Sequence, residues 1–159
     1  MKIIINIKSQ ILDLYDDQGA LLQSYAISSA LKGTGQVKGS FCTPLGRHIV
    51  RAKIGTGQPE NTVFVGRRPT GEVYTPALGA AFPGRDWMLT RILWLSGCEV
   101  GHNRLGDVDT MRRYIYIHGS PDAVPMGVPG SIGCIRMHNR DVMTLFDRVS
   151  LGTPVKISL

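Results

Sequence analysis

The residues of this sequence best suited to chemistry are a histidine and a cysteine that lie 16 positions apart. His118 is followed by Gly119, and Cys134 is preceded by Gly133, which would let a substrate approach the backbone closely. A thiol becomes a nucleophile when a nearby imidazole takes up its proton, and acyl transfer also needs N–H donors for the oxyanion. We therefore predict thiol catalysis by Cys134, with His118 as base and the amides of Gly133 and Cys134 as oxyanion donors.

Metal and nucleotide chemistry fit the sequence less well. Cys134 and His138 lie four residues apart and suggest zinc together with His118, but structural zinc sites take four ligands at paired spacings. The chain has no CxxC or HxxxH pair, so we expect no metal and no cofactor. The glycine-rich segment Lys32–Gly39 lacks a Walker or dinucleotide fingerprint. We expect it to be a mobile loop that could overhang the site.

The other cysteines and histidines have simpler interpretations. A cysteine outside a motif is most often a small buried hydrophobe, and we expect this of Cys42 and Cys98. We expect His48, His102 and His138 to be exposed polar residues.

The composition is that of a folded protein. The chain has 159 residues, of which 43% are hydrophobic and 19% charged. That is enough apolar surface to offset the entropy of folding, which excludes general disorder, and the length fits one domain over residues 1–159. The 19 glycines and nine prolines indicate many loops, and three cysteines are too few for a disulfide scaffold.

The charge is basic, with 18 Lys and Arg against 12 Asp and Glu. A net charge of +6 favours anionic partners without choosing among them. The pairs Arg67–Arg68 and Arg112–Arg113 belong to no nucleic-acid-binding motif, so we expect no nucleic acid partner. Met1–Lys8 is too short an apolar stretch for a secretion signal, and no run approaches the roughly 20 apolar residues of a membrane span. We expect a soluble domain with neither feature.

Short strands separated by turns must position these residues. Ile3, Ile5 and Ile7 would share one face of a strand, with Lys2 and Asn6 on the other face. Arg67–Gly71 reads as the turn of a hairpin. We predict further strands over Ile11–Tyr15, Leu21–Ser28, His48–Lys53, Thr62–Gly66, Glu72–Thr75, Arg91–Leu95, Arg112–His118 and Val155–Ser158.

One helix is predicted late in the chain. Val142, Leu145, Phe146 and Val149 recur at the spacing of an amphipathic helix, with Asn139 as its expected N-cap. Together, these strands and the helix predict a mainly β fold, sandwich-like or barrel-like, with a helix after the cysteine.

The stretch from His118 to Asn139 resembles the signature of the L,D-transpeptidase catalytic domain, of the YkuD or ErfK/YbiS type. That family carries a His, a spacer, Ser/Thr-His-Gly-Cys, an aliphatic residue, Arg, and an Asn two residues later. Here Ser131–Arg136 reads Ser-Ile-Gly-Cys-Ile-Arg, Asn139 follows one residue later than usual, and Ile132 stands where the family usually has His. The earlier Thr43–Gly46 resembles the family's Thr-Pro-x-Gly turn.

The resemblance implies a β-sandwich-like fold and acyl transfer on peptidoglycan stem peptides. Cys134 would attack the carbonyl of an L-to-D peptide bond, release D-Ala and hold the acyl group as a thioester. The amine of a second stem would then form a cross-link. Two alternatives remain open: an L,D-carboxypeptidase, in which water resolves the thioester, and a non-catalytic peptidoglycan-binding module. The resemblance also implies acylation of the cysteine by carbapenems.

The resemblance also implies roles for the neighbours of Cys134. His118 would activate the thiol, and the carbonyl of Gly119 would orient the imidazole. Arg136 would support the active-site loop or bind a substrate carboxylate, and Ser131 would shape the turn or donate a hydrogen bond near the thiol.

Overall fold

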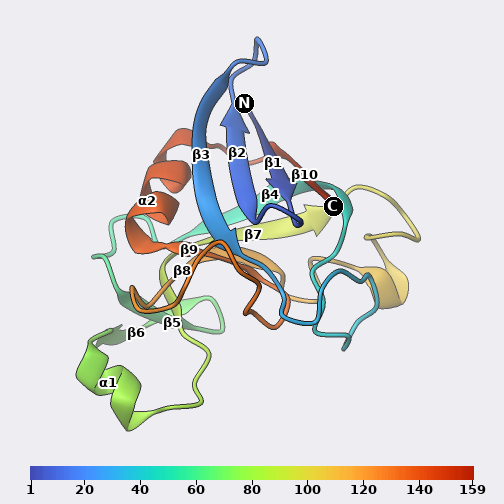
Figure 1. Cartoon of the computed structure of the whole chain (residues 1–159). Coiled ribbons are helices and arrows are strands. Elements are labelled where there is room, and N and C mark those ends of the chain that lie inside the picture. The colour runs from blue at the N-terminus through green and yellow to red at the C-terminus, as the bar shows by residue number, and fades with distance from the viewer.

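Ten strands carry most of the fold, and the computed structural model describes all residues from Met1 to Leu159. Figure 1 shows the N-terminal strands in the upper part of the molecule, with the C-terminus close to them. In chain order, the elements are β1 Lys2–Asn6, β2 Ile11–Tyr15, β3 Leu21–Ser28, β4 Gly46–Ile54, β5 Thr62–Val65, β6 Arg68–Val73, α1 Pro76–Ala81, β7 Met88–Gly97, the 3-10 helix η1 Gly106–Val108, β8 Tyr116–Ser120, β9 Ile135–His138, α2 Asn139–Arg148 and β10 Pro154–Ser158.

The strands pair in the order β4-β10-β1-β2-β3-β9-β8-β7-β5-β6, and a further pairing of β4 with β7 closes the first eight into a ring. Only two pairings between strands are parallel, β1 with β10 and β8 with β9. In Figure 1, β1, β2 and β3 stand across the layer formed by β4, β7, β8 and β9, while α2 packs against β7, β8 and β9. The expectation of a mainly β, sandwich-like fold with a helix after the cysteine is confirmed.

The main core lies between the two layers and is lined by alternate residues of the strands. Ile3 and Ile5 are buried there, as their spacing predicts, and Ile117 of β8 joins them. A fully buried aliphatic side chain of this size contributes about 1.5–3 kcal/mol of transfer free energy. Tyr116 and His118 alternate with Ile117, so they lie on the opposite face of β8. That face, away from the main core, is where the candidate site forms.

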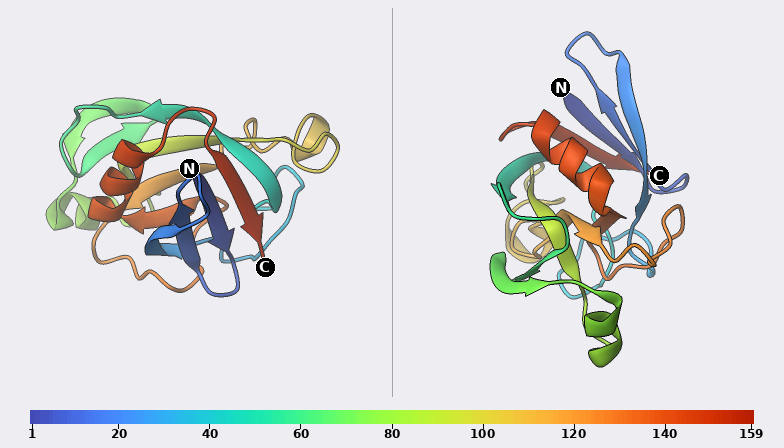
Figure 2. Two further views of the ribbon diagram at one scale, coloured as in Figure 1. Left: turned by 90° about the horizontal axis from the view of Figure 1, so that it is seen from above. Right: turned by 90° about the vertical axis from the view of Figure 1, so that its left-hand side faces the viewer.

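Helix α2 buries the apolar face that the sequence predicts for it. Val142, Leu145 and Phe146 pack into the main core, and the two views of Figure 2 show the helix lying along one side of the strands. The predicted cap is wrong by one residue: His138 is the N-cap and Asn139 is the first helical residue. The Asn139 side chain is buried and bonded elsewhere, so it is not available to cap the helix.

Several strand boundaries also differ from prediction, and two of the differences involve residues with positive φ. The β5–β6 turn is formed by Gly66 and Arg67, both with positive φ, which is the requirement of a tight type I′ hairpin. The segment predicted as turn therefore lies largely within β6. Strand β8 begins at Tyr116, because Tyr114 has a φ of 56° and leaves the extended conformation. Helix α1 was not predicted; Thr75 caps it by accepting the N–H of Leu78.

The predicted exposure of His48 is wrong. Its side chain is 1% exposed, because the alternation of β4 turns it inward. The ring nitrogens are hydrogen-bonded to the Gly46 carbonyl and to Oγ1 of Thr110, and burial lowers the pKa of His48 to about 4. His102 is exposed as predicted.

The predicted burial of the two other cysteines is also wrong. Cys98 is exposed because it follows directly after the end of β7, and Cys42 is half-buried in a loop. Neither helix has the length and apolar character that a membrane span requires.

Candidate active site

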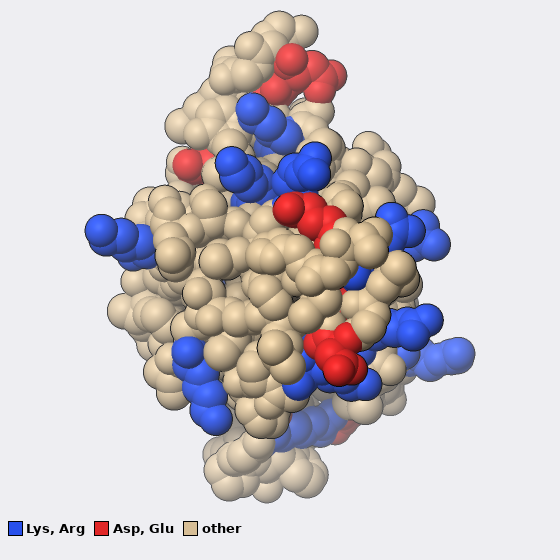
Figure 3. Space-filling model, turned by 90° about the vertical axis from the view of Figure 1, so that its right-hand side faces the viewer, with Lys and Arg blue, Asp and Glu red and all other residues tan.

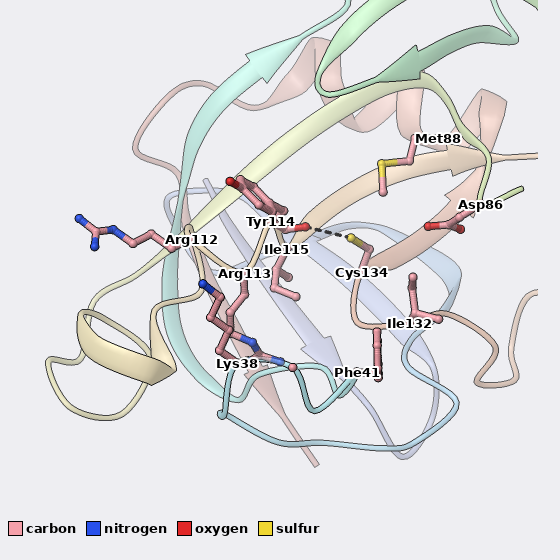
Figure 4. A pocket seen from close by; sticks show the side chains of 11 residues that line it. Lys38, Phe41, Asp86, Met88, Arg112, Arg113, Tyr114, Ile115, Ile132 and Cys134 are labelled. Atoms are coloured by element: carbon pink, nitrogen blue, oxygen red, sulfur yellow. Dashed lines mark hydrogen bonds between the residues drawn. The ribbon is translucent and has the colours of Figure 1, made fainter.

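Cys134 lies at a cavity of about 350 Å³ on the face of β8 that is turned away from the main core. Figure 4 shows side chains reaching this cavity from separate segments of the chain. Lys38 and Phe41 come from the loop before β4, Met88 from the start of β7, and Tyr114 from the segment before β8. The cysteine is 7% exposed, so a substrate must enter the cavity to reach it.

The parallel pairing of β8 with β9 brings the predicted histidine and cysteine to one face. His118 is paired with Arg136, and Ile117 with Ile135. Cys134 immediately precedes Ile135, which places it beside Tyr116, two residues before His118. Because side chains alternate along a strand, Cys134 and His118 both lie opposite the main core. The two residues that the sequence separates by 16 positions thus lie on one face of the β8–β9 pair.

The sulfur of Cys134 has two backbone partners. The N–H of Tyr116 donates to Sγ at 3.3 Å, and the thiol donates to the carbonyl oxygen of Tyr114, also at 3.3 Å. The positive φ of Tyr114 accompanies this arrangement. Burial raises the pKa of the Cys134 thiol to about 12, against the opposing effect of the Tyr116 N–H. The free protein therefore holds a protonated thiol at neutral pH.

The imidazole of His118 is fully buried and held by its own neighbour. Nδ1 lies 2.7 Å from the carbonyl oxygen of Gly119. A carbonyl oxygen only accepts, so Nδ1 carries the proton and Nε2 is left with a free lone pair. Burial lowers the pKa of His118, and the Gly119 carbonyl opposes this only in part. The imidazole is therefore neutral at pH 7 and able to accept a proton through Nε2.

A neutral thiol beside a neutral imidazole defines what the site can do. A thiolate does not pre-exist, so nucleophilic attack by this sulfur would require a base to take up its proton. The thiol donates to Tyr114 rather than to the imidazole in the free protein, and catalytic hydrogen bonds are often completed only when a substrate is bound. The arrangement suits general-base-assisted attack on a carbonyl carbon.

Ser131 shapes the turn that presents Cys134. Its Oγ donates to the carbonyl oxygen of Cys134 at 2.5 Å and accepts the N–H of Gly133 at 3.2 Å. Thr43, from the predicted Thr-Pro-Leu-Gly turn, donates to the carbonyl oxygen of Gly133 at 2.9 Å. Because the Gly133 N–H is already bonded to Ser131, it can serve an oxyanion only by leaving that partner.

Arg136 supports the loop between β8 and β9. Its guanidinium donates to the Gly130 carbonyl at 2.9 Å and to the Asp86 carboxylate at 3.1 Å. Both groups of the ion pair are partly exposed, so it contributes about 1 kcal/mol or less. Of the two roles considered for Arg136, these contacts correspond to loop support. Ile132 lies between Ser131 and Gly133, and its exposed side chain lines the cavity.

A hydrogen-bonded network around Asn139 leaves no room for a side chain at Gly119. Oδ1 of Asn139 accepts a hydrogen bond from Oγ1 of Thr90 at 2.6 Å, and Nδ2 donates to Oδ1 of Asn61 at 2.9 Å. The Asn139 oxygen lies 2.4 Å from where a Cβ on Gly119 would stand. Thr90 is buried with a φ of 73°, a conformation that a β-branched residue rarely adopts. The only sequence signal for this network is the Asn of the motif.

The glycine-rich loop does overhang the site, and Arg113 holds it there. The guanidinium donates to the carbonyl oxygens of Gly35, Gln36 and Cys42 at 3.1, 3.0 and 2.7 Å. Lys38 and Gly39 at the end of this loop line the cavity, and so does Phe41 two residues later, which is half-exposed. The segment predicted to be mobile is thus tied to the segment that leads into β8.

Cysteine alkylation tests the protonation state of the thiol. With iodoacetamide at pH 7.5, we expect Cys98 to be labelled first and Cys134 at least about tenfold more slowly, because Cys134 is buried and its pKa is about 12. Peptide mass spectrometry over a time course measures both rates. The Cys134→Ala variant shows whether the slow label belongs to Cys134 and not to the half-buried Cys42. Faster labelling of Cys134 than of Cys98 would contradict a buried neutral thiol.

Several solved structures with a similar fold are L,D-transpeptidases. An L,D-transpeptidase from Mycobacterium smegmatis is 18% identical and has a TM-score of 0.57 over 99% of this chain and 58% of that one. L,D-transpeptidase 3 from Mycobacterium tuberculosis, in complex with a faropenem-derived adduct, is 15% identical, with a TM-score of 0.59 over 99% and 59%. The Enterococcus faecium L,D-transpeptidase is 20% identical, with a TM-score of 0.59 over 99% and 49%.

These identities establish the shared fold, and the chain spans about half to three-fifths of the length of these structures. No curated protein matches the sequence. The family model for the L,D-transpeptidase catalytic domain, YkuD, matches residues 1–157. The match covers nearly the entire chain, including His118 and Cys134. The chain belongs to the YkuD family of L,D-transpeptidase catalytic domains.

Proposed function

We propose that this protein is a cysteine acyltransferase that acts on peptidoglycan stem peptides and that Cys134 is its nucleophile. One observation carries the proposal: the cavity ends on a thiol that shares a strand face with an imidazole whose Nε2 is free to accept its proton. Membership of the YkuD family supplies the substrate class.

The first half of the reaction would proceed through His118 and Cys134. As Sγ attacks the carbonyl carbon of the L-to-D peptide bond, its proton passes to Nε2 of His118 and the carbonyl oxygen becomes an oxyanion near the amides of Gly133 and Cys134. Gly119 keeps Nδ1 protonated throughout, so the imidazole stays correctly aligned. Collapse of the intermediate breaks the C–N bond, His118 returns the proton to the departing amine, and D-Ala leaves a thioester on Cys134.

The second half would reverse these roles. The amine of a second stem attacks the thioester carbonyl, and His118 takes the proton of that amine. Collapse then breaks the C–S bond, the proton returns to sulfur, and a new peptide bond forms. Water attacking in place of the amine would make the protein an L,D-carboxypeptidase, and only the products separate these outcomes.

Incubation with a disaccharide tetrapeptide stem tests the reaction. We expect release of D-Ala together with cross-linked dimers in the wild-type protein, and neither product in Cys134→Ala, when the products are resolved by mass spectrometry. D-Ala with no dimer would identify a carboxypeptidase. Binding to purified sacculi without D-Ala release, unchanged in Cys134→Ala, would identify a non-catalytic binding module and overturn the proposal.

Carbapenem acylation is a second test of the nucleophile. Among similar structures are L,D-transpeptidases in complex with imipenem and with a faropenem-derived adduct. We expect imipenem to add its mass once to the wild-type protein and to Cys98→Ala, but not to Cys134→Ala. Intact-protein mass spectrometry measures the adduct. An adduct that persists in Cys134→Ala would show that another group reacts.

A further inference from the structure

The thiol of Cys134 is held by the backbone groups of two tyrosines. Sγ accepts a hydrogen bond from the N–H of Tyr116 and donates one to the carbonyl oxygen of Tyr114, each at 3.3 Å. Figure 4 draws the bond between the thiol and the Tyr114 carbonyl. No other hydrogen bond reaches this sulfur. The position of Sγ therefore depends on the conformation of the segment from Tyr114 to Tyr116.

Tyr114 needs a restraint to keep this conformation. Its φ of 56° is costly for a residue other than glycine, and such a residue keeps a strained backbone only where its surroundings enforce it. Its side chain is 55% exposed, so burial does not enforce it. The peptide group that carries its carbonyl is held on the other side by a long hydrogen bond, from the N–H of Ile115 to the Thr110 carbonyl at 3.4 Å. A contact of the Tyr114 ring would therefore add to the hold on that carbonyl.

Arg67 makes that contact from the turn of the β5–β6 hairpin. Its guanidinium carbon lies 5.0 Å from the ring centroid of Tyr114 and 4.7 Å from that of Trp94, within the range of cation–π interactions. Nη1 of Arg67 donates to the hydroxyl of Tyr116 at 3.0 Å. One guanidinium thus contacts the side chains of both tyrosines whose backbone groups bind the sulfur.

The elements that carry these contacts are themselves fixed. Strand β5 pairs with β7, where Phe64 lies opposite Met88, and Phe64 is buried. Trp94 of β7 donates through Nε1 to the carbonyl oxygen of Met111 at 3.0 Å. Arg67 therefore reaches the tyrosines from a hairpin and a strand that are tied into the fold, and it can restrain the segment that they form.

Contacts, and not charge alone, distinguish Arg67 from the other basic residues. On the face of the molecule shown in Figure 3, Lys and Arg side chains are scattered and do not gather in one patch. Arg67 belongs to none of the four ion pairs of the structure. The next residue, Arg68, is exposed, and its side chain makes no hydrogen bond, ion pair or cation–π contact. Arg68 is therefore a matched control for Arg67.

We propose that Arg67 is a positioning residue: by holding the side chains of Tyr114 and Tyr116, it keeps their backbone groups on the sulfur of Cys134 and the thiol in one orientation. The consequence for turnover rests on the proposed function, whereas the effect on the thiol does not. A thiol held in one orientation loses less entropy when it reaches a carbonyl carbon, so the loss of Arg67 acts on kcat more than on KM.

Arg67→Gln tests the effect on turnover. For D-Ala release from the tetrapeptide, we expect kcat to fall about tenfold and KM to change by less than about threefold. Arg67→Lys keeps a charge near the rings and a donor for the Tyr116 hydroxyl, so it should restore kcat to within about threefold of the wild type. Arg68→Gln should match the wild type. An unchanged kcat, or a rise in KM alone, would overturn the proposal.

Tyr116→Phe tests whether Arg67 acts through this segment. The variant keeps the ring and removes the hydroxyl that accepts from Arg67, and we expect kcat to fall about threefold. Combining it with Arg67→Gln should give no greater loss than Arg67→Gln alone, because the hydrogen bond is already absent. If the two losses multiply, Arg67 acts by another route and the proposal is wrong.

Alkylation of Cys134 tests the effect on the thiol without a substrate. With iodoacetamide at pH 8.5, we expect Cys134 to be labelled about fivefold faster in Arg67→Gln than in the wild type, because a thiol released from its two partners is more accessible. The rate at the exposed Cys98 is the internal reference, and Arg68→Gln should show no change. Denaturant unfolding measures stability in parallel. If a lower unfolding free energy accounts for the faster labelling, the proposal is wrong.

These measurements separate the positioning role from the function itself. Where the wild type releases D-Ala, the proposal requires both a lower kcat and faster alkylation in Arg67→Gln. Faster alkylation that Arg67→Lys reverses, with no D-Ala release from the wild type, would uphold the positioning and overturn the acyltransferase. D-Ala release from the wild type, with kcat and alkylation unchanged in Arg67→Gln, would do the reverse. Absence of both D-Ala release and any change in alkylation would overturn both proposals.

Discussion

His118→Ala is expected to lower kcat/KM for D-Ala release by about 10²- to 10⁴-fold, the usual contribution of a general base. The effect should be large because the pKa of the Cys134 thiol is about 12, so no thiolate pre-exists to bypass the missing base. Steady-state kinetics on the tetrapeptide measure the loss. The exposed His102 provides a matched control, and His102→Ala should retain wild-type activity. Full activity in His118→Ala would remove His118 from the mechanism.

The dependence of the wild-type kcat/KM on pH tests whether the thiol and the imidazole are both neutral in the free protein. Burial lowers the pKa of His118, so the imidazole loses its proton-accepting form only when the pH falls below its ordinary value near 6.5. We expect kcat/KM to be level from about pH 6.5 to 9 and to fall at more acid pH. The thiol adds no limb in that range, because its pKa is about 12. A thiolate–imidazolium pair would instead lose activity as rising pH deprotonated the imidazolium, and such a basic limb would contradict the neutral pair.

Gly119→Ala is expected to impair both folding and catalysis. A Cβ there would stand 2.4 Å from Oδ1 of Asn139 and 2.6 Å from the carbonyl oxygen of Leu89, so the backbone has to move. Overpacking of this kind costs about 1–3 kcal/mol of unfolding free energy. Movement of the Gly119 carbonyl would also release Nδ1 of His118, and we expect kcat to fall about 100-fold because the imidazole is misaligned.

Denaturant unfolding and steady-state kinetics separate the two effects of Gly119→Ala. Gly84→Ala is the matched control, since a Cβ at Gly84 meets nothing within 4 Å, and it should leave both quantities unchanged. Adding Asn139→Ala removes the nearest obstructing atom but leaves the Leu89 carbonyl, so any recovery of stability should be partial. Wild-type stability and kcat in Gly119→Ala would show that the backbone here yields easily and does not fix the imidazole.

Much of the fold could be predicted from local patterns. Three local predictions are confirmed in the structure. They are the burial of Ile3 and Ile5 on one strand face, the hairpin of Ile11–Tyr15 with Leu21–Ser28, and the buried apolar face of α2. These signals are local, because a strand repeats every two residues and a helix every 3.6. The predicted start of strand β8 is wrong for a non-local reason. The positive φ of Tyr114 accompanies a hydrogen bond with Cys134, and no local pattern around residue 114 contains that partner.

In the candidate site, too, the sequence determined one part and the tertiary structure determined another. The sequence by itself determined the residue types of the chemistry, a thiol, an imidazole and the glycines beside them, because their spacing and flanking residues form a specific motif. Only the tertiary structure decided their state. The parallel register of β8 and β9 brings them to one face, burial keeps both neutral, and Asn139 fills the space beside Gly119. Desolvation and packing depend on every segment that surrounds a group, so they follow from the complete fold and not from the motif.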